Sequence, residues 1–186
     1  YVIFTATTMS GIPVPVAILA SIVICTVLGV VIEGIAYRPL RGTSSLAVLI
    51  TAIGVSYFLQ NAVQLIYGAN AKSFKSVVPL KAVNLAGGKL VISGETIVTI
   101  ISCVVIMIAL NTFVNKTKTG HAMLAVAEDR QAAELMGINV NKTISLTFAI
   151  GSGLAAVAGM LLCSAYPNLT PTTGAMPGIK AFTAAV

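Results

Sequence analysis

Four long apolar stretches dominate the chain, at residues 12–32, 46–67, 96–114 and 143–166, and none contains Asp, Glu, Lys or Arg. Each is close to the roughly 20 apolar residues that a helix needs to cross a bilayer core. The strands of a membrane barrel alternate apolar and polar positions, and these stretches do not. Because lipid offers no hydrogen-bond partners, each stretch must satisfy its own backbone as a helix. The pattern therefore predicts an all-α, polytopic transmembrane helix bundle with about four full spans.

The segments outside these stretches are polar and rich in turn residues. Proline, glycine and threonine follow the fourth stretch, and a further apolar element is expected to start near Ala181. The chain begins at Tyr1 without a methionine and stops at Val186 inside this apolar stretch. We therefore expect residues 1–186 to form a single transmembrane domain that is incomplete at both ends, with residues 115–142 as a loop within it.

The composition excludes several classes of protein. Hydrophobic residues make up 57% of the chain and charged residues 9%, well below the roughly 25% typical of soluble domains. The net charge of +6 comes from eleven scattered Lys and Arg residues, which suit loops facing anionic lipid headgroups rather than nucleic acid. The three cysteines, Cys25, Cys103 and Cys163, lie in apolar runs without CxxC spacing, so we expect neither a metal site nor a disulfide.

The order of the spans predicts which loops lie together. With four spans, the loops 38–45 and 115–142 share one face of the membrane, and the loop between the second and third spans lies on the other. The first face carries six Lys and Arg residues against five on the second, which favours the first as cytoplasmic. Glu33, near the inner end of the first span, is expected to pair with a loop arginine.

The loop 115–142 is the most informative part of the chain. Residues His121 to Met136 are rich in Ala and Leu and predict one helix of about four turns, with Arg130 and Glu134 one turn apart. Gly137 follows it in the C-cap position. A short helix that presents alanine and charge outside the membrane suits docking of a soluble partner, whereas the alternative is a plain solvated connector.

Several blocks of this sequence resemble one family of membrane proteins. Gln131-Ala-Ala-Glu-Leu-Met-Gly137 resembles the Glu-Ala-Ala signature of bacterial ABC importer permeases, although Gln131 stands in place of its first Glu. Five further blocks resemble the LivH-type permease of branched-chain amino acid ABC transporters: Ala36-Tyr-Arg-Pro-Leu-Arg41, the stretch from Ile50 to Asn61, Ala127-Glu-Asp-Arg130, Met136-Gly-Ile-Asn139 and Lys180-Ala-Phe-Thr-Ala-Ala185.

The resemblance implies a function. It implies a multi-pass subunit of the bacterial cytoplasmic membrane that provides the translocation path for branched-chain amino acids and is not itself an enzyme. Its implied partners are separate ABC ATPase subunits, a second permease subunit that forms a heterodimer with this one, an extracytoplasmic substrate-binding protein and membrane lipid. The sequence has no GxxxxGK[ST] motif for ATP, and we expect no cofactor. The implied ATPase-coupling residues are Glu128, Asp129, Arg130, Gln131, Ala132, Ala133 and Gly137.

Polar and small residues within two spans supply further candidates. The second span carries the amides and hydroxyls that could line a translocation path, or else join helices: Thr51, Ser56, Gln60, Asn61 and Gln64. The fourth span places Gly151, Ala155 and Gly159 four residues apart, which predicts a face for close helix packing.

Other functions remain open from the sequence. A permease of this type could carry another small polar solute, such as other amino acids, urea or amides. An ion-coupled secondary transporter would be expected to have acidic residues or broken helices near mid-membrane. The second, third and fourth spans contain no acid, and the first has only Glu33 at its inner end. A membrane enzyme finds no support, since no His/Asp/Glu cluster or nucleophile–base pair occurs.

Overall fold

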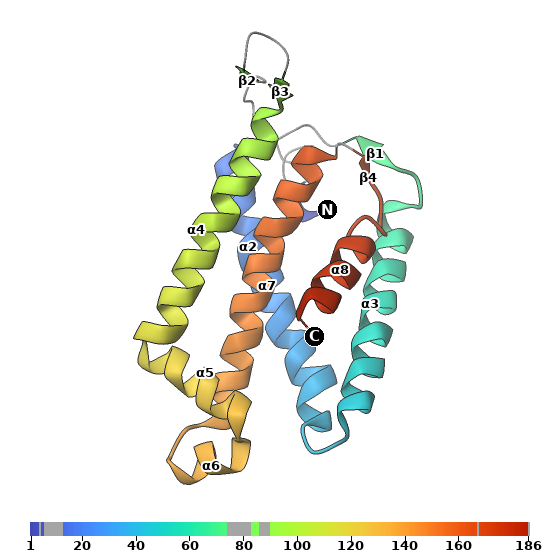
Figure 1. Cartoon of the computed structure of the whole chain (residues 1–186). Coiled ribbons are helices and arrows are strands. Elements are labelled where there is room, and N and C mark those ends of the chain that lie inside the picture. Colours follow the sequence, from blue (N-terminus) through green and yellow to red (C-terminus); the bar gives the residue numbers. More distant parts are fainter. Residues whose placement is uncertain (4, 6–12, 74–82, 86–89, 167, 186) are drawn as a thin grey trace.

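A computed structural model describes residues 1–3, 5, 13–73, 83–85, 90–166 and 168–185 of the chain. Its long helices are α2 (Val14–Ile32), α3 (Ser45–Tyr67), α4 (Gly94–Lys116) and α7 (Val140–Ala165), which stand upright in Figure 1. Each is long and apolar enough to cross a membrane. The predicted all-α bundle of about four spans is therefore confirmed.

The first span changes its helix type before it ends. After α2 the chain continues through a π-helical turn, η1 (Glu33–Tyr37), and a short 3-10 turn, η2 (Arg38–Leu40). In η1 the backbone N–H of Arg38 donates to the carbonyl oxygen of Glu33, five residues earlier. Such π turns are rare and are often found at functional sites.

The loops gather at the two ends of the bundle as predicted. Figure 1 places α5 (Lys118–Glu128) and α6 (Arg130–Leu135) at the lower end, where the α2–α3 connection also lies. At the other end β1 (Lys72–Ser73) pairs with β4 (Asn168–Leu169), and β2 (Val83–Leu85) with β3 (Leu90–Ile92), both antiparallel. The β1–β4 pair ties the connection after α3 to the connection after α7.

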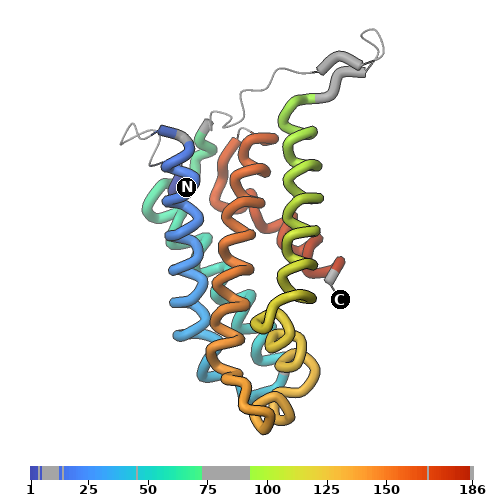
Figure 2. The backbone as a smooth tube through the Cα atoms, turned by 90° about the vertical axis from the view of Figure 1, so that its left-hand side faces the viewer, coloured from blue at the N-terminus to red at the C-terminus, as the bar shows by residue number. Residues whose placement is uncertain are grey.

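Helices α2 and α7 form the most extensive helix pair in the described chain, and small residues permit their contact. A Cβ atom added at Gly29 would lie 2.4 Å from both Cβ and Oγ of Ser152. A Cβ at Gly153 would lie 3.2 Å from Oγ1 of Thr26. Small residues let two membrane helices approach closely enough for dispersion contacts to hold them together. Figure 2 shows the two helices side by side along most of their length.

Helices α3 and α4 expose large apolar side chains along their length. Leu65 is 86% exposed and Met107 65% exposed. Since both helices are apolar enough to span a bilayer, lipid or further helices can cover these faces.

The last described helix, α8 (Ala175–Ala185), begins earlier than the sequence pattern predicts. The expected start near Ala181 is wrong by six residues, because Pro177 occurs within the first turn of the helix. Proline is tolerated there, since a first-turn N–H has no partner within the helix. Both views show the end of α8 at mid-height of the bundle, so α8 returns toward the level of the spans.

The α2–α7 contact generates a test of the bundle. Replacing Gly29 with Leu is expected to lower the free energy of unfolding by about 1–3 kcal/mol, because the side chain must force α2 away from α7. Thermal unfolding in detergent measures this effect. Gly54→Leu in α3 is the matched control, since a Cβ at Gly54 meets nothing within 4 Å. Equal melting temperatures for the two variants would contradict the packing described here.

The ends of the bundle generate a second test. In a cysteine-free background, we expect Cys at Asn70 to react with an impermeant maleimide added outside cells. Cys at Lys118, which is exposed at the opposite end, should react only after permeabilisation. The reverse pattern would place α5 and α6 outside and contradict the orientation drawn from the positive residues.

Candidate coupling site

A glycine makes the sharp corner where α4 turns into α5. The Thr117 hydroxyl accepts a hydrogen bond from the Gly120 N–H at 3.0 Å and caps α5. Gly120 is buried, and a Cβ there would lie 2.3 Å from the carbonyl oxygen of Val114. The corner therefore depends on a residue without a side chain, and it directs α5 across the end of the bundle.

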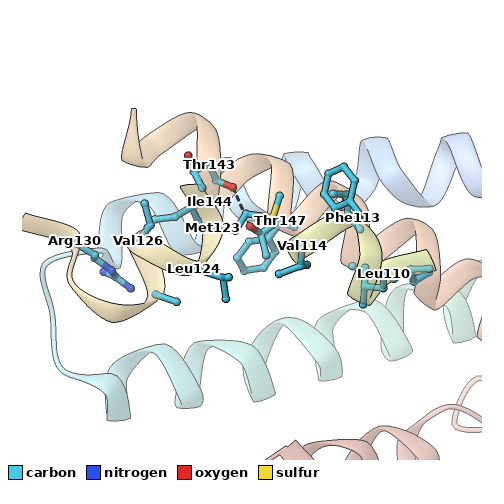
Figure 3. A pocket seen from close by; sticks show the side chains of 15 residues that line it. Leu110, Phe113, Val114, Met123, Leu124, Val126, Arg130, Thr143, Ile144 and Thr147 are labelled. Atoms are coloured by element: carbon cyan, nitrogen blue, oxygen red, sulfur yellow. Dashed lines mark hydrogen bonds between the residues drawn. The ribbon is translucent and has the colours of Figure 1, made fainter. Parts of the chain in front are cut away.

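Helix α5 rests on the bundle through its apolar face. Together α4, α5 and α7 line an apolar pocket of about 470 Å³. Figure 3 shows Phe113, Met123 and Ile144 among its lining residues, with Arg130 at the α6 side. Val126 of α5 is only 6% exposed. Helix α5 contacts both α4 and α7, which holds it against the lower end of the bundle in Figure 1.

The predicted single helix over His121–Met136 is wrong, because Asp129 breaks it into α5 and α6. Asp129 has the extended backbone angles φ −146° and ψ 115°. Its carboxylate Oδ1 accepts hydrogen bonds from the N–H groups of Gln131 at 2.8 Å and Ala132 at 3.2 Å. Aspartate is among the preferred N-cap residues, so Asp129 starts a new helix instead of continuing the first. This cap is the signal in the sequence that could have revealed the break.

The end of α6 confirms the predicted left-handed turn at Gly137. Gly137 has φ +81°, a backbone conformation that L side chains rarely adopt. Its N–H donates to the carbonyl oxygen of Glu134 at 2.9 Å, and the Ile138 N–H donates to that of Ala133 at 3.0 Å. This pair of bonds is a Schellman motif, which ends a helix and reverses the direction of the chain.

Most of the predicted coupling residues are exposed on this loop. They are Glu128, Asp129, Arg130, Gln131, Ala132 and Gly137. Ala133 is not, since it is 3% exposed. Ala133 lies on the face of α6 that turns toward the bundle, and its role in ATPase coupling stays a prediction.

Two exposed apolar residues at the tip of the loop are missing from the predicted set. Leu135 is 89% exposed and Met136 is 83% exposed, although both lie outside the four apolar spans. An apolar pair directly before a C-cap glycine in an otherwise polar loop is the pattern that could have indicated them. Exposed apolar side chains in an aqueous region are a feature of protein-binding surfaces.

The predicted path residues of α3 bond mainly within their own helix. The Gln60 amide nitrogen donates to the Ser56 hydroxyl at 3.2 Å, so these two share a face. The Asn61 amide donates to the Tyr57 carbonyl at 2.7 Å, and the Thr51 hydroxyl to that of Ala47 at 2.8 Å. Asn61 and Gln64 are exposed. Their use as a translocation path stays a prediction.

The predicted small-residue face of α7 is exposed and makes no close helix contact at its two glycines. A Cβ atom added at Gly151 or at Gly159 meets nothing within 4 Å in the described chain. Gly153 and Ser152 make the close approach to α2 instead. Packing of another helix against Gly151, Ala155 and Gly159 stays a prediction.

Metal-binding groups are not clustered in the part of the chain that the structure describes. No three His, Cys, Asp or Glu side chains there lie close enough together to hold an ion. Cys25, Cys103 and Cys163 are all free thiols.

Several known proteins are similar to this chain in sequence. The family described as the permease component of branched-chain amino acid transport systems matches residues 1–186. The chain is 43% identical over 172 residues to the permease BraD of Pseudomonas aeruginosa, covering 91% of this chain and 56% of that protein. It is 40% identical over 193 residues to LivH of Escherichia coli (strain K12), covering 100% of this chain and 63% of that protein.

The chain is more distantly similar to a permease that is named for a sugar. The fructose import permease FrcC of Rhizobium meliloti is 27% identical over 132 residues, or 70% of this chain and 35% of that protein. No solved structure matches the chain significantly. The chain spans between about half and two thirds of the length of BraD and LivH. BraD and LivH are named as permease proteins of bacterial transport systems, and the four apolar helices of this chain fit a multi-pass protein of the inner membrane. The chain belongs to the branched-chain amino acid permease-component family.

Proposed function

We propose that this chain is part of the translocation subunit of an ATP-driven importer for branched-chain amino acids, and that α6 is the element through which separate ATPase subunits drive it. The tip of α6 carries the proposal. Leu135 and Met136 are almost fully exposed there, beyond the four apolar spans. Full burial of such a side chain contributes about 1.5–3 kcal/mol, so a partner that covers both gains substantial affinity.

The shape of the loop supports this use of α6. Its start is capped by Asp129 and its end by the turn at Gly137, so its geometry is defined at both ends. The N-terminal side is anchored by α5, which rests on α4 and α7. A helix that is fixed at both ends can transmit a displacement caused by a partner to the spans, whereas a flexible connector would not.

The proposed substrate class is drawn from the names of the most similar relatives. Those of 39–43% identity that cover nearly the whole chain are named as branched-chain amino acid permeases. The fructose permease matches less of the chain at lower identity. The amides and hydroxyls of α3, from Thr51 to Gln64, are proposed to line the path, because a zwitterionic amino acid needs hydrogen-bonding groups within the membrane.

Further subunits complete the proposed assembly. ABC permeases work with ATPase and substrate-binding partners. We propose a second permease subunit as well, which would cover the apolar faces that α3 and α4 expose.

The apolar tip can be tested directly. We expect Leu135→Asp to reduce co-purification of the ATPase subunits at least ten-fold, because an unpaired charge enters an apolar contact. Met136→Asp should behave in the same way. Lys118→Asp, an exposed change at the other end of the loop, is the control for altered charge. Normal ATPase recovery with both tip variants would contradict docking at the tip.

The turn after α6 provides a second test. Gly137→Val should lower substrate-stimulated ATP hydrolysis several-fold, because a β-branched residue at φ +81° costs about 1–2 kcal/mol or more and misdirects the chain. Gly42→Val, at an exposed glycine of the α2–α3 connection with ordinary backbone angles, should leave hydrolysis near the wild-type rate. Equal effects of the two changes would show that the direction of α6 does not matter.

A further inference from the structure

A buried acid lies at the inner end of the first span. Glu33, at the start of η1, is 2% exposed. Its carboxylate Oε1 forms an ion pair with the Arg41 guanidinium, and Oε2 accepts a hydrogen bond from the Ser145 hydroxyl at 2.7 Å. A buried carboxylate needs such partners, because its desolvation would otherwise cost several kcal/mol. The expected pairing with a loop arginine is therefore confirmed, and it joins the α2 end to α7.

Arg41 is the centre of a wider network. Its second guanidinium nitrogen donates to the side-chain oxygen of Asn141, in the first turn of α7. Its backbone carbonyl accepts a hydrogen bond from the Arg130 guanidinium at 3.1 Å. Arg130 is the first residue of α6, and Asn141 lies six residues beyond its end. Arg41 thus contacts the chain on both sides of α6.

The ionic interactions in this region converge on the same point. Glu33 and Arg41 form an ion pair at the α2–α3 connection. Arg130 and Glu134, one turn apart in sequence, form no ion pair there, and Arg130 bonds to Arg41 instead. The Tyr37 ring at the end of η1 packs on Phe148 of α7 with 5.0 Å between ring centroids. The π turn, the α2–α3 connection and both flanks of α6 therefore form one connected unit.

We propose that Glu33, Arg41 and Asn141 are positioning residues that transmit displacement of α6 to the inner ends of α2 and α3. This inference rests on the proposed role of α6 as the ATPase contact. If α6 moves, Arg41 either moves with it or loses its bonds to Arg130 and Asn141. Separating Arg41 from Glu33 is costly, because the buried carboxylate would then lack its counter-charge. The low-cost response is a joint movement of α6, Arg41 and the η1 turn.

A purely structural ion pair would respond differently to substitution. Replacing both members of a buried pair with neutral residues is often neutral for stability, whereas removing one member is strongly destabilising. The double variant Glu33→Gln/Arg41→Met therefore separates transmission from folding. Asn141→Ala is a second probe, since Asn141 is exposed and its loss leaves the buried ion pair intact.

The experiment uses the full-length permease, assembled with its ATPase and binding-protein partners and reconstituted in liposomes. Co-purification of the ATPase, basal ATP hydrolysis, and hydrolysis stimulated by leucine-loaded binding protein are measured. We expect both probes to retain ATPase co-purification and basal hydrolysis. The stimulation of hydrolysis by leucine-loaded binding protein should fall about ten-fold, which is within the usual range of coupling between sites. Arg38→Gln is the matched control, an exposed arginine in the same connection that should behave as wild type.

The outcomes separate the two proposals. If loaded binding protein stimulates hydrolysis by both probes as strongly as by the wild type, the network is only structural. The inference is then overturned, while the proposed function stands. If the wild type neither retains the ATPase nor responds to loaded binding protein, the proposed function itself fails. If the double variant does not assemble, Asn141→Ala decides: loss of stimulation supports transmission, and wild-type stimulation overturns it.

Discussion

A lipid bilayer offers no hydrogen-bond partners to the peptide backbone, and the architecture of this chain depends on that constraint. Four segments close their backbone bonds internally as helices. The irregular backbone described by the structure, including the short strand pairs, lies mainly at the two ends of the bundle. Even hydroxyls inside the spans, such as Thr26 and Thr51, donate to carbonyl oxygens one turn earlier.

Within a bilayer, side-chain size and specific polar contacts decide which helices meet. Gly29, Ser152 and Gly153 let α2 and α7 approach, since burial of apolar surface gives no advantage when lipid is equally apolar. At the end of this pair where η1 follows α2, the contacts become polar. The Ser145 hydroxyl donates a hydrogen bond to the Glu33 carboxylate there. One helix pair therefore has a dispersion contact along its length and a charged one at its end.

The charged end of this pair meets the loop that carries α6. Arg41 joins the Glu33 carboxylate to the surroundings of α6, and the apolar tip of α6 is exposed. An ATP-driven importer needs a surface that binds its ATPase and a connection from that surface to its membrane helices. In the proposed function Leu135 and Met136 form the ATPase-binding surface. In the inferred network Arg41 and its partners form the connection.

The sequence by itself determined the spans, the grouping of the loops and the left-handed turn at Gly137. These follow from hydropathy, chain order and a local backbone preference, which act over a few residues. The cap at Asp129 is also local and could have been predicted. Only the tertiary structure decided that Ala133 is buried, that Gly153 rather than Gly151 approaches α2, and that Glu33 meets Ser145, 112 residues away. The helical period shows which residues share a face, but the direction of that face depends on how helices distant in the chain pack together.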